Sequence, residues 1–211
     1  MRRVALFGIA AAVAAGCSSD SPRTPAQPDS ISLPLRVSAA QHAGVPHNHS
    51  VHLSGDQENP PRDTNAQGQA IFHIAPDDES FTYKLIASNI ENVVQAHIHC
   101  GTATQNGPII VWLYPSVTAT QALQVANGRH DGILAEGTVE ADGPDHVRVL
   151  DPDPTREACP DGVANFEEVL EKIRTGEAYV NIHTNDQVAP GNTGPGDFPG
   201  GEVRGQFPDR D

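Results

Sequence analysis

The sequence predicts an all-β fold: one antiparallel domain of the β-sandwich or barrel-like type with a single short helix. Glycine and proline are frequent, at 19 and 18 of the 211 residues, and they separate short apolar runs. Within these runs apolar and polar residues alternate, which is the pattern of a strand with one buried face. Several short strands with frequent turn signals are typical of β-sandwiches and barrels.

Seven segments show this strand pattern: 69–75, 80–88, 93–100, 107–115, 132–141, 178–184 and 200–208. The first two are joined by the turn-like residues 76–79 (PDDE), so we expect a hairpin there. In the last segment, Val203 and Phe207 share one face and Arg204 lies on the other.

One segment, at about residues 165–175, predicts a helix instead. Its apolar residues recur at i, i+3, i+4 and i+7, as on one face of a helix: Phe166, Val169, Leu170 and Ile173. Asn165 is a suitable N-cap with Glu168 three residues later, and Gly176 is a suitable end. We therefore expect a helix that leads directly into the strand 178–184.

The first 16 residues have the order of a secretory signal: a basic start (MRR), an uncharged apolar run and small residues. The run is shorter than the roughly 18 residues of a membrane-spanning helix. The residues AAGC resemble the lipobox of bacterial lipoproteins, although Ala14 stands where that family usually has leucine. The resemblance implies that Cys17 is lipidated and anchors the protein in the cell envelope, facing the periplasm or the cell exterior. An ordinary signal peptide is the alternative.

Residues 17–45 are rich in Ser, Pro, Ala and Gln, so we expect a flexible tether that follows the lipidated cysteine. Residues 46–211 have the size of one domain. The formal net charge is −14. Such an acidic chain is a poor candidate for nucleic acid, because phosphates require a basic surface.

Besides Cys17, the chain has Cys100 and Cys159. An exported protein folds in an oxidising compartment, so these two cysteines most simply pair as a disulfide. A thiolate metal ligand at Cys100 and two free thiols are the alternatives.

Alternation also places histidines together. In the segment 93–100, His97 and His99 point to one face, while Ile98 and Cys100 point to the other. In the segment 178–184, His183 shares a face with Tyr179 and Asn181. If the two strands are neighbours, three imidazoles converge and form a donor set suited to copper or zinc. The alternative is an ordinary polar strand face.

A second histidine cluster lies at the start of the domain, in the segment 46–52 (PHNHSVH). Alternation places His47 and His49 on one face and His52 on the other. We favour an exposed polar segment at the tether junction over a loose metal site. The sequence has no G-x-S-x-G elbow, P-loop or H-E-x-x-H, and we predict no catalytic residue.

Four blocks of the sequence resemble, in order, those of the CHRD domain, named after chordin: LSGDQENPP (53–61), AHIHCG with NGPIIVWL, GEAYVNIHT and GGEVRGQ. The resemblance covers about residues 51–207. It implies an all-β, sandwich-like fold and a binding or interaction module rather than an enzyme. It leaves the protein or small-molecule partner unidentified.

A looser resemblance concerns His97 and His99. Copper–zinc superoxide dismutases also carry His-x-His on a strand of a β-sandwich and a late histidine as a further copper ligand. This implies a metal site at His97, His99 and His183, and a copper-dependent redox protein is the alternative function. However, no histidine lies between His99 and His130, where that family places its bridging histidine. A purely structural module without metal is the third possibility.

Overall fold

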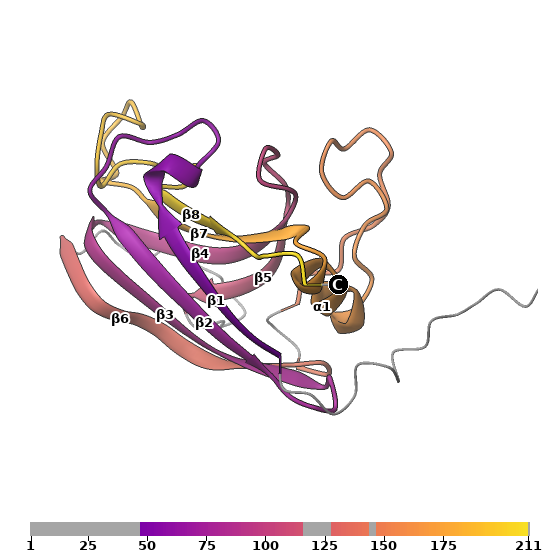
Figure 1. Ribbon diagram of the computed structural model, residues 1–211. Coiled ribbons are helices and arrows are strands. Elements are labelled where there is room, and N and C mark those ends of the chain that lie inside the picture. The colour runs from indigo at the N-terminus through magenta and orange to yellow at the C-terminus, as the bar shows by residue number, and fades with distance from the viewer. Residues whose placement is uncertain (1–46, 116–127, 144–146, 211) are drawn as a thin grey trace, which may run out of the picture. The chain divides into compact units, whose positions relative to one another are not determined.

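The computed structural model describes residues 47–115, 128–143 and 147–210 (Figure 1). The expected signal segment, the tether 17–45 and Cys17 lie outside the described residues. Within the described part, no helix has the length and apolar character needed to cross a membrane.

In these residues eight strands form one sheet: β1 (His47–Ser54), β2 (Gln67–Ile74), β3 (Ser80–Glu91), β4 (Val93–Cys100), β5 (Ile109–Tyr114), β6 (Arg129–Glu140), β7 (Ala178–Thr184) and β8 (Val203–Gln206). The order in the sheet is β5-β4-β7-β8-β1-β2-β3-β6, and all neighbours pair antiparallel. The sequence correctly predicted the all-β fold class and the β2–β3 hairpin.

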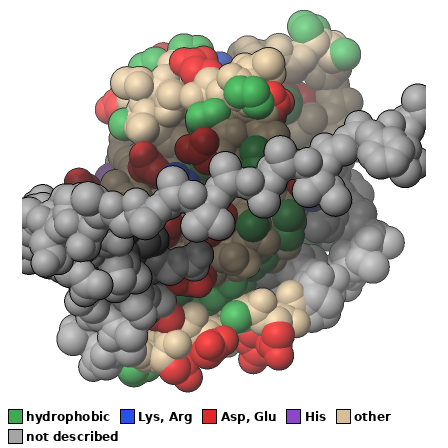
Figure 2. Space-filling view, turned by 90° about the vertical axis from the view of Figure 1, so that its right-hand side faces the viewer, with side chains coloured by type: hydrophobic (Ala, Val, Ile, Leu, Met, Phe, Trp, Pro, Cys, Tyr) green, Lys and Arg blue, Asp and Glu red, His purple; other side chains and the backbone are tan. Residues whose placement is uncertain are grey.

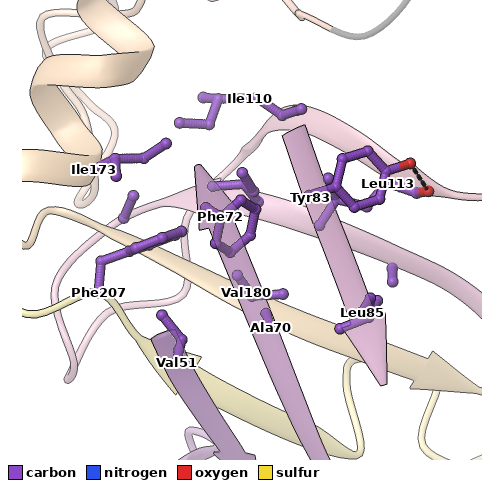
Figure 3. Close-up of a cluster of buried hydrophobic side chains, with 14 of the residues drawn as sticks. Val51, Ala70, Phe72, Tyr83, Leu85, Ile110, Leu113, Ile173, Val180 and Phe207 are labelled. Carbon is purple, nitrogen blue, oxygen red and sulfur yellow. Dashed lines mark hydrogen bonds between the residues drawn. The ribbon is translucent and has the colours of Figure 1, made fainter. Parts of the chain in front are cut away.

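The sheet curls into a barrel (Figure 1). The barrel is nearly closed, since its two edge strands, β5 and β6, contact each other. The Tyr83 hydroxyl on β3 donates a hydrogen bond of 2.8 Å to the Leu113 carbonyl on β5, drawn dashed in Figure 3. An isolated antiparallel bridge also joins Val111 of β5 to Val147. These contacts join the edge strand β5 to β3 and to the segment that follows β6.

The interior of the barrel contains the hydrophobic core. Phe72 lies at its centre, with ring centroids 5.7 Å from Phe81 and 5.1 Å from Phe207. Figure 3 shows Phe72 of β2 and Phe207, which follows β8, in the same buried cluster as Ile173 of the helix. Burying a side chain of this size contributes about 1.5–3 kcal/mol, so the inward face of each strand supplies most of the stabilisation.

The helix α1 spans Phe166–Arg174, close to the predicted bounds. The Asn165 side chain accepts a hydrogen bond from the backbone N–H of Glu168, as an N-cap does. Gly176 follows the helix with φ +69°, the left-handed conformation common at helix ends. The apolar face of α1 is buried, and Phe166 stacks on Phe81 with centroids 5.7 Å apart.

The segment at the start of the domain differs from our expectation of an exposed polar stretch. Residues 47–54 form β1, which lies inside the sheet between β2 and β8. His49 is buried and its ring meets the ring of Phe207 edge-on at 5.7 Å, whereas His52 is exposed. The expected alternation is present, but pairing with β2 and with the distant strand β8 buries one face of this polar segment.

Cys100 and Cys159 form the predicted disulfide, with Cα atoms 6.0 Å apart. Cys100 belongs to the core, in agreement with the inward face that alternation gave it. Figure 2 shows one face of the molecule, on which Asp and Glu side chains are far more widespread than Lys and Arg. This surface agrees with the acidic net charge of −14.

Candidate metal centre

The three predicted histidines meet on the outward face of the neighbouring strands β4 and β7. In the antiparallel register His97 lies opposite Asn181, and His99 lies opposite Tyr179. The ring centroid of His183 is 5.0 Å from that of His97 and 5.8 Å from that of His99. One nitrogen from each imidazole can be chosen so that all three lie within 4.8 Å of one another. The sequence-based prediction required the two histidine-bearing strands to be neighbours. The pairing of β4 with β7 meets this condition and brings the three imidazoles together.

Backbone carbonyls orient two of the three rings. His183 Nδ1 lies 2.9 Å from the Pro199 carbonyl oxygen, and His99 Nδ1 lies 2.8 Å from the Gly107 carbonyl oxygen. A carbonyl only accepts, so both Nδ1 atoms carry the proton and donate. In the neutral rings this assigns a free lone pair to Nε2 of both histidines. Such a hydrogen bond is how proteins fix the tautomer of a metal-binding histidine.

The closest pair of ring nitrogens joins His97 and His183. Nδ1 of His97 is 3.2 Å from Nε2 of His183, and since the latter is an acceptor, His97 donates. Two nitrogens at this separation, each about 2.0–2.1 Å from one ion, subtend an angle of roughly 100° at the ion, close to tetrahedral. A metal ion can therefore be held between these two nitrogens with little movement of the rings, once the His97 proton moves from Nδ1 to the unpartnered Nε2.

Two ring nitrogens of the cluster, His97 Nε2 and His99 Nε2, are buried and have no hydrogen-bond partner. Buried polar atoms in proteins are nearly always hydrogen-bonded, so each exception requires a reason. For His99 the reason fits the geometry, because the unpartnered Nε2 is the atom that carries the free lone pair. The donor set is thus suited to an ion that accepts nitrogen lone pairs.

Burial keeps the imidazoles uncharged. It lowers the pKa of His99 to about 3, with a further contribution from the neighbouring His183. Burial also lowers the pKa of His97 and of His183 below the usual range, because the charged form loses its hydration. At neutral pH the three rings are therefore uncharged, which is the charge state of a metal-binding imidazole.

Aromatic rings pack around the cluster. The Trp112 ring of β5 lies 4.2 Å from the ring of His97, measured between centroids. Tyr179 stacks on His99 with centroids 5.0 Å apart and an angle of 8° between the planes. The Trp112 and Tyr179 rings limit the displacement of His97 and His99 by packing against them. The Gly107 and Pro199 carbonyls fix the rotation of the His99 and His183 rings.

The loop after β4 supplies the carbonyl that holds His99. A Cβ atom on Gly107 would lie 1.6 Å from the Cys100 carbonyl oxygen, so only glycine fits this close approach. The Gly107 N–H donates to the Tyr179 hydroxyl at 3.1 Å. The disulfide from Cys100 to Cys159 fixes the strand end where this loop begins.

The loop before β8 supplies the carbonyl that holds His183. Glu202 is fully buried there and accepts hydrogen bonds from the Thr64 and Thr184 hydroxyls, both at 2.6 Å. It also accepts one from the Gly196 N–H at 2.9 Å. This carboxylate ties the loop to β7 and so places the Pro199 carbonyl over His183.

Arg204 of β8 ties the loop after β4 to the sheet and stacks on Tyr179. Its guanidinium carbon lies 3.4 Å from the centroid of the Tyr179 ring. Its nitrogens donate to the carbonyl oxygens of Thr102 at 2.7 Å and Gln105 at 3.0 Å. A planar fork is needed to make these contacts together with the stacking.

Arg204→Lys should therefore lower the free energy of unfolding by about 2–3 kcal/mol, since lysine keeps the charge but loses the fork and the stacking. Urea denaturation measures this loss. Arg210→Lys is a matched control, because Arg210 is exposed and donates to the Asn48 carbonyl. A loss for Arg204→Lys no larger than that of the control would contradict the role assigned to Arg204.

The sequence predicted all three histidines of the cluster, and the structure brings them together. Sequence reasoning did not predict the packing of Trp112 against His97, or the orienting role of the Gly107 and Pro199 carbonyls. Asn181 was placed on the correct face, but without a role. Among residues 47–115, 128–143 and 147–210, this is the one group of three or more His, Cys, Asp or Glu side chains arranged to hold a metal.

Comparison with known families agrees with the fold and with the sequence blocks. The profile of the CHRD domain matches residues 49–207, which is most of the chain and includes all three histidines. Searches among curated proteins and among solved structures gave no significant match. The chain belongs to the CHRD domain family.

Proposed function

We propose that the domain is a binding module that holds a copper or zinc ion through His97, His99 and His183. The observation that carries the proposal is the convergence of the three imidazoles to within 4.8 Å, with two tautomers set by backbone carbonyls. Membership of the CHRD family supports a binding or interaction module.

Copper and zinc are favoured by the chemistry of the donors. Neutral imidazole nitrogens suit Zn²⁺ and Cu²⁺, whereas calcium and magnesium prefer oxygen ligands. Three protein ligands leave a coordination position for an exogenous group, as in zinc sites that bind small molecules. The bound ion would supply a Lewis-acidic contact for such a group, while this chain orients the ligands and limits access of water.

We also propose that the domain functions in the cell envelope, anchored by lipid on Cys17. The support is the order of residues 1–17 in the sequence. Radiolabelled palmitate incorporated by the wild-type protein and not by Cys17→Ser would test it. Equal labelling of both proteins would reject the anchor at Cys17.

Titration with copper tests the metal site directly. Trp112 is the single tryptophan of the chain, and its ring lies 4.2 Å from that of His97. We expect Cu²⁺ to quench the tryptophan fluorescence with an end point at one ion per chain. Elemental analysis after dialysis should give the same stoichiometry for copper or zinc.

Protein that retains no metal after dialysis and shows no saturable quenching would reject the metal site. A superoxide assay on the copper-loaded protein separates binding from the dismutase hypothesis. A rate no higher than that of free copper at the same concentration would reject dismutase activity and leave the binding proposal intact.

A further inference from the structure

A buried carboxyl group lies next to Asn181, the residue opposite His97 in the pairing of β4 and β7, and is not one of the three proposed ligands. Glu58 follows the short 3₁₀ helix η2 (Gly55–Gln57), and only 6% of its surface is exposed. Its Oε1 atom has no hydrogen-bond partner. The Asn59 N–H and the Asn181 amide approach the carboxyl group, so one of its two oxygens is left without a donor in a buried position, which costs free energy.

Asn181 connects this carboxyl group to the cluster. It lies between His97 of β4 and Arg204 of β8 in the sheet register. Its amide lies beside both the Glu58 carboxyl group and the His99 ring, and its Oδ1 is buried without a partner. The carboxyl group, the amide and the imidazoles therefore form a continuous polar layer on the outward face of the sheet.

Gly201 permits this arrangement. A Cβ atom at this position would lie 2.4 Å from Glu58 Oε1 and 2.7 Å from Asn181 Nδ2. Gly201 also has φ +124°, which L side chains rarely adopt. The absence of a side chain at Gly201 therefore leaves room for the carboxyl group and the amide to lie next to each other.

We propose that Glu58 is the counter-charge of the metal site, losing its proton when a cation binds to the three histidines. This inference rests on the proposed metal binding. Binding of the ion then releases one proton, which leaves the carboxylic acid for solvent and creates a carboxylate beside the new positive charge. Glu58 thereby acts through Asn181 as a positioning and charge-balancing residue.

The ionisation of Glu58 supports this inference. Burial raises the pKa of Glu58 to about 7, although the nearby Arg204 and Arg62 lower it. Tyr179 is the other ionisable group that interacts with Glu58, and burial raises its pKa above the usual value of 10.0. A pKa of about 7 places the change in charge of Glu58 between pH 5 and 8.

The sign of the pH dependence follows from this pKa. A cation favours the carboxylate, so the pKa of Glu58 falls on metal binding. Metal affinity therefore rises by at most tenfold per pH unit up to about pH 7 and is constant above it.

A pocket gives Glu58 the route to solvent that proton release needs. It has a volume of about 350 Å³. Its wall includes the side chains of Glu58, Asn59 and Arg204 and the loop residues Ala103 and Thr104. The carboxyl group thus lies between solvent on one side and the Asn181 amide on the other.

The test compares zinc affinity at pH 5.5, 6.5 and 7.5 in the wild type, Glu58→Gln and Glu171→Gln. We expect wild-type affinity to increase over this range roughly tenfold more than that of Glu58→Gln. Glu171→Gln removes a charge from the exposed surface of α1 and should follow the wild type. Calorimetry in buffers of different ionisation enthalpy should show more proton release at pH 6.5 in the wild type than in Glu58→Gln.

Parallel pH profiles in the wild type and Glu58→Gln would overturn this inference while leaving metal binding intact. Absence of zinc binding in the wild type at every pH would instead reject the proposed function. If Glu58→Gln fails to fold, calorimetry of the wild type decides, because binding without proton release at pH 6.5 contradicts the role of Glu58.

Discussion

His183→Ala should weaken the binding of copper and zinc by more than roughly 100-fold. Mutation of a residue that only hydrogen-bonds to a metal ligand already lowers metal affinity by about 10- to 100-fold, and loss of a ligand itself should cost more. The substitution removes the imidazole whose Nε2 lies 3.2 Å from His97 Nδ1, leaving two ligands from a single strand. Competition with a chromophoric chelator measures the affinity. His97→Ala should have an effect of the same size, because it removes the other member of the closest pair.

His52→Ala provides the matched control. His52 is exposed on β1, whereas the exposed surface of His183 is only 8%. The control should bind copper with wild-type affinity and quench Trp112 to the same end point. Retention of full affinity in His183→Ala would contradict the site. Loss in His52→Ala as well would show that the ion binds to exposed histidines.

Removal of the disulfide should have the largest effect on stability. Cys100 and Cys159 are 59 residues apart, and a loop of this length restricts the unfolded chain by about 4 kcal/mol. The double variant Cys100→Ser/Cys159→Ser should therefore lose approximately this free energy of unfolding, measured by urea denaturation. The buried Cys100 position adds to the loss, because serine brings a hydroxyl into the core.

Wild-type protein unfolded in the presence of a reductant gives the control without substitution. Its free energy of unfolding should fall by a similar amount. Metal affinity of the folded double variant should also decrease, because the Gly107 carbonyl that holds His99 follows the strand end at Cys100. A change in stability below about 1 kcal/mol would show that the bridge contributes little.

Local periodicity was sufficient to predict most of the fold. The alternation in β2, β3, β4 and β7 depends only on which residues face the core, and the helix depends on a 3.6-residue period. β1 was not predicted as a central strand because its segment is polar and one of its two partners, β8, lies far away in the sequence. Ser54 of β1 pairs with Arg204, a contact that no local pattern reports.

The site was predictable in its side chains but not in its support. Alternation placed His97 and His99 on one face, yet their meeting with His183 requires β4 and β7 to be neighbours, which tertiary packing decides. The groups that orient the rings are backbone carbonyls, which every residue possesses, so they leave no mark in the sequence. Glu58 lies in a turn outside any periodic segment, and its closeness to Asn181 appears only in three dimensions.

The carbonyl acceptors of Pro199 and Gly107 have a consequence for how this domain tolerates change. A side-chain substitution at Pro199, or at loop residues other than Gly107, leaves the oxygen in the chain, provided that the backbone keeps its path. Gly107 is the exception, because a Cβ atom there would clash with the Cys100 carbonyl. An insertion or deletion in either loop, by contrast, shifts the oxygen away from its imidazole. Variants of loop length should therefore be more harmful to the ring orientations than variants of loop composition, which is the reverse of the tolerance expected for ordinary surface loops.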